Sequence, residues 1–236
     1  MTDNVVTLGL GGWQNAGMKI GTWNLDGRWS ANHQQFLKNE KCDIWLLTEV
    51  PKRFALDGGD LFRSMPMTEE KSWAGVWSNH NAASSPSPHP AAAMAVRDGV
   101  IYCSCVLPWR SARPWWPAED TGDVAAMTAA TLARLRTGLL AAPGAVVWGG
   151  DWNHALHERE VAGTNRGRVE IEKLRVELQL QVPTERLPHA KHGLLSIDHI
   201  AIPAAWQVTK CRRVVAEADG KRLSDHDAYI VDCTPP

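Results

Sequence analysis

The chain has 236 residues, of which 44% are hydrophobic, and its formal net charge is −1. This length and apolar content can bury one sizeable core and favour a single large domain. The near-neutral charge excludes a strongly basic nucleic-acid coat, so a polyanion would have to be bound through local basic loops or a metal.

The N-terminal sequence and the cysteines predict the cellular compartment of the protein. Residues 1–17 are Gly-rich and weakly patterned, so we expect a flexible leader there and one domain over residues 18–236. No secretory signal is evident, and no apolar run approaches the ~20 residues of a membrane span. The five cysteines form no C-x-x-C pair, which is typical of reduced thiols in the cytosol. We therefore predict a cytoplasmic protein without a membrane span.

The first predicted elements form a strand, a helix and a strand. MKIGTWNL (18–25) alternates as a strand does, and Ser30 stands as an N-cap before the helical run at 31–41. The short continuous apolar run DIWLLTEV (43–50) suits a strand that is covered on both faces. This order predicts a βαβ opening.

The middle of the chain predicts more strands and a long helix. Successive strands are expected at 72–78, 91–97 and 99–109, with an unpaired Ser/Pro loop at 79–90 between the first two. The Ala/Leu-rich stretch 121–142 has helical spacing, and Thr121 or Asp123 could cap it.

The later part repeats this mixture of elements. A buried strand is expected at 143–152, a second long helix at 166–180, and two late strands at 197–203 and 227–233. Strands outnumber helices and the two mix throughout, so the class is α/β or α+β. Two packed sheets with helices outside would use this many strands.

Polar residues recur where the apolar strands stop. An acid that ends an apolar strand is costly unless it is paired, solvated or bound to a metal. Five such clusters in one chain are therefore hard to explain as separate surface residues. The residues concerned are Asn24, Glu49, Asp151, Asn153, Asp198, Asp225 and His226.

These residue types suit hydrolysis of a phosphate ester. Carboxylate oxygens are hard ligands that hold Mg²⁺, and the metal offsets charge that develops on phosphate oxygens. A carboxylate can also take a proton from an attacking water. A His that is held by an Asp can donate hydrogen bonds to the phosphate.

The same residues carry a resemblance to a known family. TWNL, LLTEV, GDWN, SIDHI and LSDHD occur in the order seen in the endonuclease/exonuclease/phosphatase superfamily, over about residues 18–233. The resemblance implies the DNase I-like fold, a four-layer α/β/β/α sandwich in which two packed mixed β-sheets are flanked by helices. It also implies metal-dependent phosphoesterase chemistry.

The resemblance implies a role for each strand-end residue. Glu49 resembles the principal metal ligand, with Asn24 beside it and Asp225 assisting. Asp151 resembles the residue that aligns or deprotonates the nucleophilic water, and Asn153 would steady the phosphate or the nucleophile. His226 would contact the scissile phosphate, and Asp198 would orient His226.

One stretch departs from the resembled family. Many members place a His at the end of a mid-chain strand, but CVLPWRSARPWW (105–116) contains none. Trp109, Arg110 or Arg113 is expected to occupy that space. Branches without this His exist within the resemblance, including those that resemble abasic-site endonucleases, so the missing His does not exclude activity. The DNase-type acid/base pair does not transfer.

Three loops mix basic residues with other functional types. The loop at 107–116 interleaves three Trp with two Arg, which suits base stacking with phosphate contact or a lid packed by its own aromatics. Residues 164–168 and 186–192 would rim the catalytic face of the resembled fold, or they carry ordinary solvated charge.

Two histidine patterns have structural interpretations. His154 and His157 form N-H-x-x-H, a spacing that zinc sites use, but no third ligand is suitably placed in the sequence, so loop polarity is favoured. His199 follows Asp198 on a strand and therefore points to the opposite face. We interpret it as a structural His.

The sequence thus predicts a Mg²⁺-dependent phosphodiesterase, with Mn²⁺ able to substitute, whose substrate is nucleic acid. The second hypothesis is a phosphatase or phosphodiesterase acting on a small or lipid-linked phosphate. The third is an inactive relative that binds phosphates or a protein. Trp109, Arg110 and Arg113 are the predicted substrate contacts, and no protein partner is predicted.

Overall fold

The computed structural model describes residues 17–141, 143–157 and 162–236. The first 16 residues of the predicted leader lie outside this part of the chain. Within the described residues, the chain forms two six-stranded sheets that pack face to face, a two-stranded ribbon and three helices. Among these helices, none has the length and apolar character to cross a membrane.

The first sheet contains the predicted βαβ opening. Its strand order is β11-β14-β1-β2-β4-β3, with β1 parallel to β2 and the other pairs antiparallel. The strands are β1 (Met18–Asn24), β2 (Ile44–Pro51), β3 (Asp60–Arg63), β4 (Lys71–Ser78), β11 (Gln207–Val214) and β14 (Ala228–Thr234).

The second sheet has the order β5-β6-β7-β8-β10-β9, and only β7 and β8 run parallel. Its strands are β5 (Ala83–Ser85), β6 (Ala92–Arg97), β7 (Val100–Cys105), β8 (Ala145–Asp151), β9 (Leu180–Gln181) and β10 (Asp198–Pro203). The ribbon consists of β12 (Glu217–Ala218) and β13 (Lys221–Arg222).

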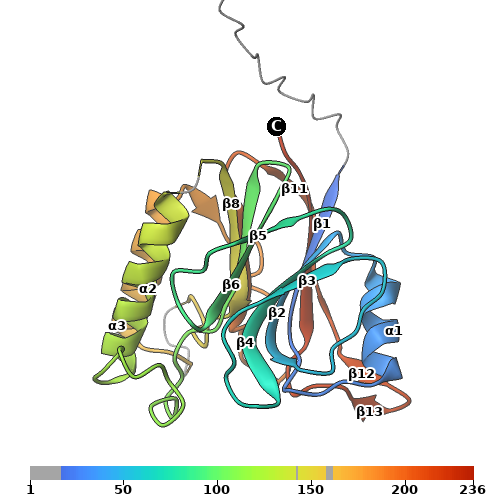
Figure 1. The fold of residues 1–236 in the computed structure, drawn as a ribbon, viewed down its shortest axis with the longest axis horizontal. Helices are drawn as coiled ribbons and strands as arrows, with labels where there is room; N and C mark the ends of the chain where they lie inside the picture. Colours follow the sequence, from blue (N-terminus) through green and yellow to red (C-terminus); the bar gives the residue numbers. More distant parts are fainter. Residues whose placement is uncertain (1–16, 142, 158–161) are drawn as a thin grey trace, which may run out of the picture.

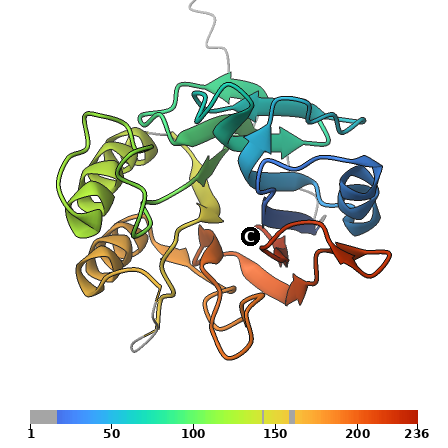
Figure 2. The same cartoon turned by 90° about the horizontal axis from the view of Figure 1, so that it is seen from below.

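Three buried apolar clusters define the layers. The cluster between the sheets includes Ile44, Tyr102 and Ile200. A second cluster joins the outer face of the first sheet to α1 (Ala31–Glu40). A third joins the outer face of the second sheet to α2 (Val124–Leu140) and α3 (Asn165–Glu177). The views in Figures 1 and 2 show α1 on one side of the sandwich and α2 with α3 on the other, which confirms the predicted DNase I-like four-layer fold.

The local predictions held where apolar patterning was strong. Asp123 caps α2 by accepting a hydrogen bond from the backbone N–H of Ala126, as one of the two predicted caps. Ser30 precedes α1, but its hydroxyl contacts the imidazole of His33 instead of capping the backbone. The predicted unpaired loop at 79–90 was wrong in one respect, because the short strand β5 pairs there with β6.

Buried histidines lead us to expect that mild acid weakens the fold. Burial lowers the pKa of His199 to about 4, from an ordinary value of 6.5. The unfolded chain therefore takes up this proton at higher pH, so the stability is complete above pH 6.5 and is lost as the pH falls toward 4. At about 1.4 kcal/mol per pH unit, this residue alone should cost about 2 kcal/mol between pH 6.5 and 5.

Urea unfolding at pH 7.5 and pH 5 measures this loss. We expect His199→Gln, which keeps a neutral polar group of similar reach, to show a smaller decrease in unfolding free energy than the wild type. Groups that titrate elsewhere are the same in both proteins and cancel in the comparison. Equal decreases in the two proteins would contradict the prediction.

Candidate active site

The predicted residues come together because four strands end at the same edge of the sandwich. The parallel register of β1 and β2 sets Asn24 beside Thr48, one residue before Glu49. The antiparallel register of β8 and β10 sets Asp151 directly opposite Asp198. Figure 2 looks along the sandwich toward one end of the two sheets. One edge thus carries residues from both halves of the chain.

Asn24 joins the two sheets at this edge. Its side-chain nitrogen donates to Asp151 Oδ2 at 3.0 Å and to Glu49 Oε1 at 3.3 Å. Its side-chain oxygen accepts from the backbone N–H of Asp26 at 2.9 Å, which fixes the orientation of the amide. Asn24 is buried, so this bridge is shielded from water. It holds two carboxylates from different sheets next to each other.

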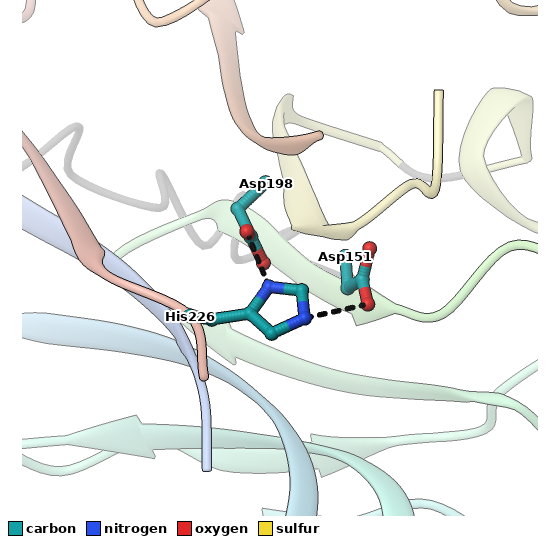
Figure 3. Close-up of side chains that lie close together, drawn as sticks. All are labelled: Asp151, Asp198 and His226. Atoms are coloured by element: carbon teal, nitrogen blue, oxygen red, sulfur yellow. Dashed lines mark hydrogen bonds and ion pairs between the residues drawn. The ribbon is translucent and has the colours of Figure 1, made fainter. Parts of the chain in front are cut away.

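Asp198, His226 and Asp151 form a row of interacting side chains (Figure 3). His226 Nδ1 lies 2.7 Å from Asp198 Oδ2, and His226 Nε2 lies 4.0 Å from Asp151 Oδ2. The backbone N–H of His226 donates to Ser224 Oγ, and this hydroxyl donates to the carbonyl oxygen of Asn24. The loop before β14 is therefore fastened to the end of β1.

Burial and charge set the protonation of this row. Burial and repulsion from Asp198 raise the pKa of Asp151. Burial opposes the charged form of His226, but the surrounding carboxylates, Asp198 first, raise its pKa to about 10. We therefore expect a charged imidazolium at neutral pH, which can donate a hydrogen bond from Nε2.

Further acidic side chains lie beside Asn24 and His226: Glu49 contacts Asn24, and Asp225 Oδ1 lies 3.9 Å from His226 Nε2. Glu49 forms an ion pair with Lys71 from β4, and Asp26 forms one with Arg28 at 2.8 Å. Burial, followed by repulsion from Asp225 and Glu49, raises the pKa of Asp26. Asp26 therefore interacts with both of the other carboxylates, although in the described part of the chain these three acids form no group as tight as Asp151, Asp198 and His226.

The sequence reasoning missed Asp26 and Lys71. Asp26 had a signal, because it follows Asn24 by two residues in the same turn. Lys71 had none, because it reaches the site from the antiparallel neighbour of β2, where it pairs with Pro51. A long-range strand register decides its position.

Unusual backbone conformations support the assignment of a functional site. Asp26, Glu49 and Asn153 adopt positive φ angles of 51°, 49° and 52°. Residues other than glycine rarely adopt the left-handed region of positive φ, and those that do are often found at active sites. The backbone N–H of Asn153 donates to Asp151 Oδ1 at 2.9 Å, and its side chain donates to the carbonyl oxygen of Leu107 at 3.0 Å.

The basic-aromatic loop at 107–116 therefore starts against the site. Beyond Leu107, Trp109 is half-buried and packs on Trp73 and Trp116. Arg110 and Arg113 are exposed, as is Trp115, which is 58% exposed. The loop thus combines a packed aromatic base with exposed basic and aromatic side chains.

The two other basic segments differ from one another. His189, in the loop at 186–192, packs edge-on against His226 with ring centroids 5.9 Å apart, so this loop borders the site. Residues 164–168 form the N-terminal cap and first turn of α3. Arg168 there donates to the carbonyl oxygens of Ala155 and Ala162 and anchors the preceding loop.

Neither His of N-H-x-x-H belongs to a metal-like cluster in the described residues. His154 is buried with Nδ1 2.8 Å from the carbonyl oxygen of Trp152, and His157 lies 3.9 Å from Glu185. In the same part of the chain, Asp151, Asp198 and His226 form a group whose potential ligand atoms lie within 4.8 Å of one another. Within this group, Nδ1 of His226 is already hydrogen-bonded to Asp198 Oδ2.

The donor chemistry of the site fits a hard divalent cation. The side chains of Glu49, Asp26 and Asp225 offer carboxylate oxygens, the ligands that Mg²⁺ prefers. Glu49 remains 21% exposed at its side chain, so its oxygens are accessible from solvent. Buried Asp198 Oδ1 has no hydrogen-bond partner among the described residues.

Comparisons with known proteins match most of the chain to a described family. A family model described as Endonuclease/Exonuclease/phosphatase family matches residues 21–226. No curated protein sequence matches the chain.

Solved structures share the fold at low sequence identity. An AP endonuclease from Archaeoglobus fulgidus has a TM-score of 0.68 and 16% identity, covering 91% of this chain and 98% of that one. The endonuclease domain of TRAS1, a telomere-specific non-LTR retrotransposon, has a TM-score of 0.63 and 15% identity, with coverages of 91% and 97%. A 3'-5' exonuclease (NExo) from Neisseria meningitidis has a TM-score of 0.62 and 19% identity, with coverages of 91% and 98%.

Proposed function

Since the chain belongs to the endonuclease/exonuclease/phosphatase family, whose members are generally hydrolases of phosphoester bonds, we propose that it is a Mg²⁺-dependent phosphodiesterase acting on nucleic acid. The observation that carries the proposal is the row Asp198–His226–Asp151, joined through Asn24 to the carboxylate of Glu49. In this proposal Asp151 is the general base, His226 is the hydrogen-bond donor to the phosphate, and Glu49 is the metal ligand; their continuous set of contacts supports these roles.

The cation has a defined place in this proposal. Glu49 is the principal ligand, and Asp26 and Asp225 add negative charge beside it. When bound, Mg²⁺, or Mn²⁺ in its place, offsets the charge that develops on the phosphate oxygens. Asn24 donates to both Glu49 and Asp151, so it fixes the position of the metal ligand relative to the general base.

The protein's own residues supply the remaining chemistry. Asp151 accepts the proton of the attacking water, and its raised pKa suits this task at neutral pH. The imidazolium of His226 donates a hydrogen bond from Nε2 to the scissile phosphate, and Asp198 keeps the ring in that orientation. Asn153, whose backbone N–H holds Asp151 Oδ1, steadies the phosphate or the water.

The loop at 107–116 favours nucleic acid as the substrate class. It begins against Asn153 and presents Arg110, Arg113 and Trp115 to solvent, which suits phosphate contact with base stacking. The structural neighbours named above include an AP endonuclease and an exonuclease. A small phosphate is the second candidate substrate. Trp73, Trp109 and Trp116 pack on one another, as expected for a loop that folds over a small ligand as a lid.

Hydrolysis of bis-p-nitrophenyl phosphate tests the chemistry before the substrate is known. We expect turnover with Mg²⁺ or Mn²⁺ and none with EDTA. A folded protein without activity under any of these conditions would favour the inactive, binding-only hypothesis.

Salt dependence of binding decides between the two substrate classes. We expect binding to a fluorescent oligonucleotide, with catalysis blocked by Asp151→Asn, to weaken steeply with salt through counterion release. Replacing Arg110 and Arg113 with Ala should flatten the log–log slope by roughly one to two units. Trp115→Ala should lower the binding free energy by about 1–3 kcal/mol without changing the slope.

A matched control removes two positive charges elsewhere. Arg136 and Lys173 are exposed on α2 and α3, and their replacement by Ala should leave the slope unchanged. A flat salt response of the parent protein, or equal effects of the two double variants, would favour the small-phosphate substrate.

A further inference from the structure

We propose that Lys71 is the resident counter-ion of Glu49, which it holds in the metal-free site and yields when a divalent cation binds. The inference rests on the proposed function, since it concerns the same ligand. It makes Lys71 a positioning residue that sets the metal affinity of the site.

The position of Lys71 is built into the first sheet. Lys71 opens β4 and pairs with Pro51, two residues after Glu49 on the neighbouring antiparallel strand. Its ammonium contacts Glu49 Oε2, while Oε1 of the same carboxylate accepts from Asn24. Both oxygens of Glu49 therefore have a donor. The side chains of Lys71 and Glu49 are only 23% and 21% exposed, so the pair is partly shielded from water.

The turn after β1 fixes the path of the lysine side chain. Gly27 has a φ of 65°, and a Cβ atom placed on it would lie 3.1 Å from Lys71 Cδ. The backbone N–H of Gly27 donates to the carbonyl oxygen of Glu49 at 3.0 Å. The aliphatic part of Lys71 thus lies over the glycine turn and reaches Glu49 by a defined route.

The charges around Glu49 explain why a counter-ion is needed. Repulsion from Asp225 and from Glu49 contributes to the raised pKa of Asp26, so Asp26 and Glu49 repel each other, and Arg28 is already paired with Asp26. Without Lys71, the neutral amide of Asn24 would be the one side-chain partner left to Glu49 among the described residues. A divalent cation that binds Glu49 at Oε2 competes there with the ammonium of Lys71, because both positive charges are attracted to the same carboxylate oxygen.

Metal affinity tests this exchange without an activity assay. Lys71→Met keeps the length of the chain and removes the charge, so Mn²⁺ should bind more tightly by calorimetry, on the order of tenfold, because one competing charge at contact distance is gone. In a Glu49→Gln background the same change should have no effect. Lys38→Met is the matched control and should leave the Mn²⁺ affinity unchanged. Lys38 lies on α1, away from the site, and forms an ion pair with Asp57 at 3.0 Å.

Chemical modification of the wild-type protein gives a second measurement that needs no variant. Reductive methylation followed by peptide mass spectrometry reports the accessibility of each lysine. We expect Lys71 to be modified faster with saturating Mg²⁺ than with EDTA, at least about threefold, while Lys38 keeps one rate under both conditions.

The outcomes separate this inference from the proposed function. Equal or weaker Mn²⁺ binding by folded Lys71→Met, with binding still dependent on Glu49, overturns the counter-ion role and leaves the metal site intact. An unchanged methylation rate of Lys71 overturns it as well. No Mn²⁺ binding by either protein overturns the proposed metal dependence itself.

Discussion

Replacing Asp151 with Asn should lower the rate of phosphoester hydrolysis by about 10²–10⁴, the usual contribution of a positioned general base. Asp151 is almost completely buried, and it accepts hydrogen bonds from Asn24 and from the backbone N–H of Asn153. These contacts aim the carboxylate, and an amide in its place cannot accept a proton from water. Steady-state hydrolysis of bis-p-nitrophenyl phosphate with saturating Mg²⁺ measures the loss.

Thermal unfolding separates this chemical effect from damage to the fold. The Asn variant removes the repulsion between residue 151 and Asp198, so we expect its melting temperature to stay close to that of the wild type. Asp43→Asn is the control, because Asp43 is half-buried and hydrogen-bonded to Asn79 before the start of β2, at the opposite end of that strand from Glu49. Wild-type activity in Asp151→Asn would remove this residue from the catalytic set.

The sequence was most informative where apolar patterning ended in a polar residue. The buried runs of β1, β2, β8 and β10 could be recognised from their composition. Asn24 and Asp151 are the last residues of β1 and β8, Asp198 is the first of β10, and Glu49 lies two residues before the end of β2. The ends of these strands lie at a common edge of the sandwich. Predicting the strands was therefore enough to predict that most of the candidate site residues lie together.

Elements without such patterning were not recognised. The strand β11 is half-exposed and rich in basic residues, so its composition indicated only surface charge. It pairs with β14, and its Arg213 also reaches the loop before that strand. There, buried Asp227 accepts from Arg213, Arg222 and the backbone N–H of Ala216. This clamp positions Asp225 and His226, yet it depends on contacts that form only after the sheet has assembled.

Lys71 shows the same limit within the site. Its neighbours in sequence, Glu70 and Ser72, indicate only the exposed start of a strand, and nothing in that pattern points to Glu49. Only the register of β2 against β4 brings the two side chains together. An ion pair between neighbouring strands depends on the tertiary fold, so it could not be predicted from the local sequence pattern.

The pairing of Asp198 with His226 should make their contributions to catalysis strongly non-additive. We expect Asp198→Ala and His226→Ala each to lower the rate by about 10²–10⁴. If Asp198 acts only through the ring that it holds at 2.7 Å, the double variant should be no slower than His226→Ala alone. Steady-state rates of the four proteins give the interaction energy directly.

A titration distinguishes orientation of the ring from general support of the fold. Asp198 raises the pKa of His226, so Asp198→Asn should move this pKa down toward 6.5, as measured by NMR of the imidazole. The alkaline limit of the rate profile should move to lower pH with it, because the imidazolium then loses its proton earlier. Fully additive losses in the double variant, together with an unchanged His226 pKa in Asp198→Asn, would show that the two residues act separately.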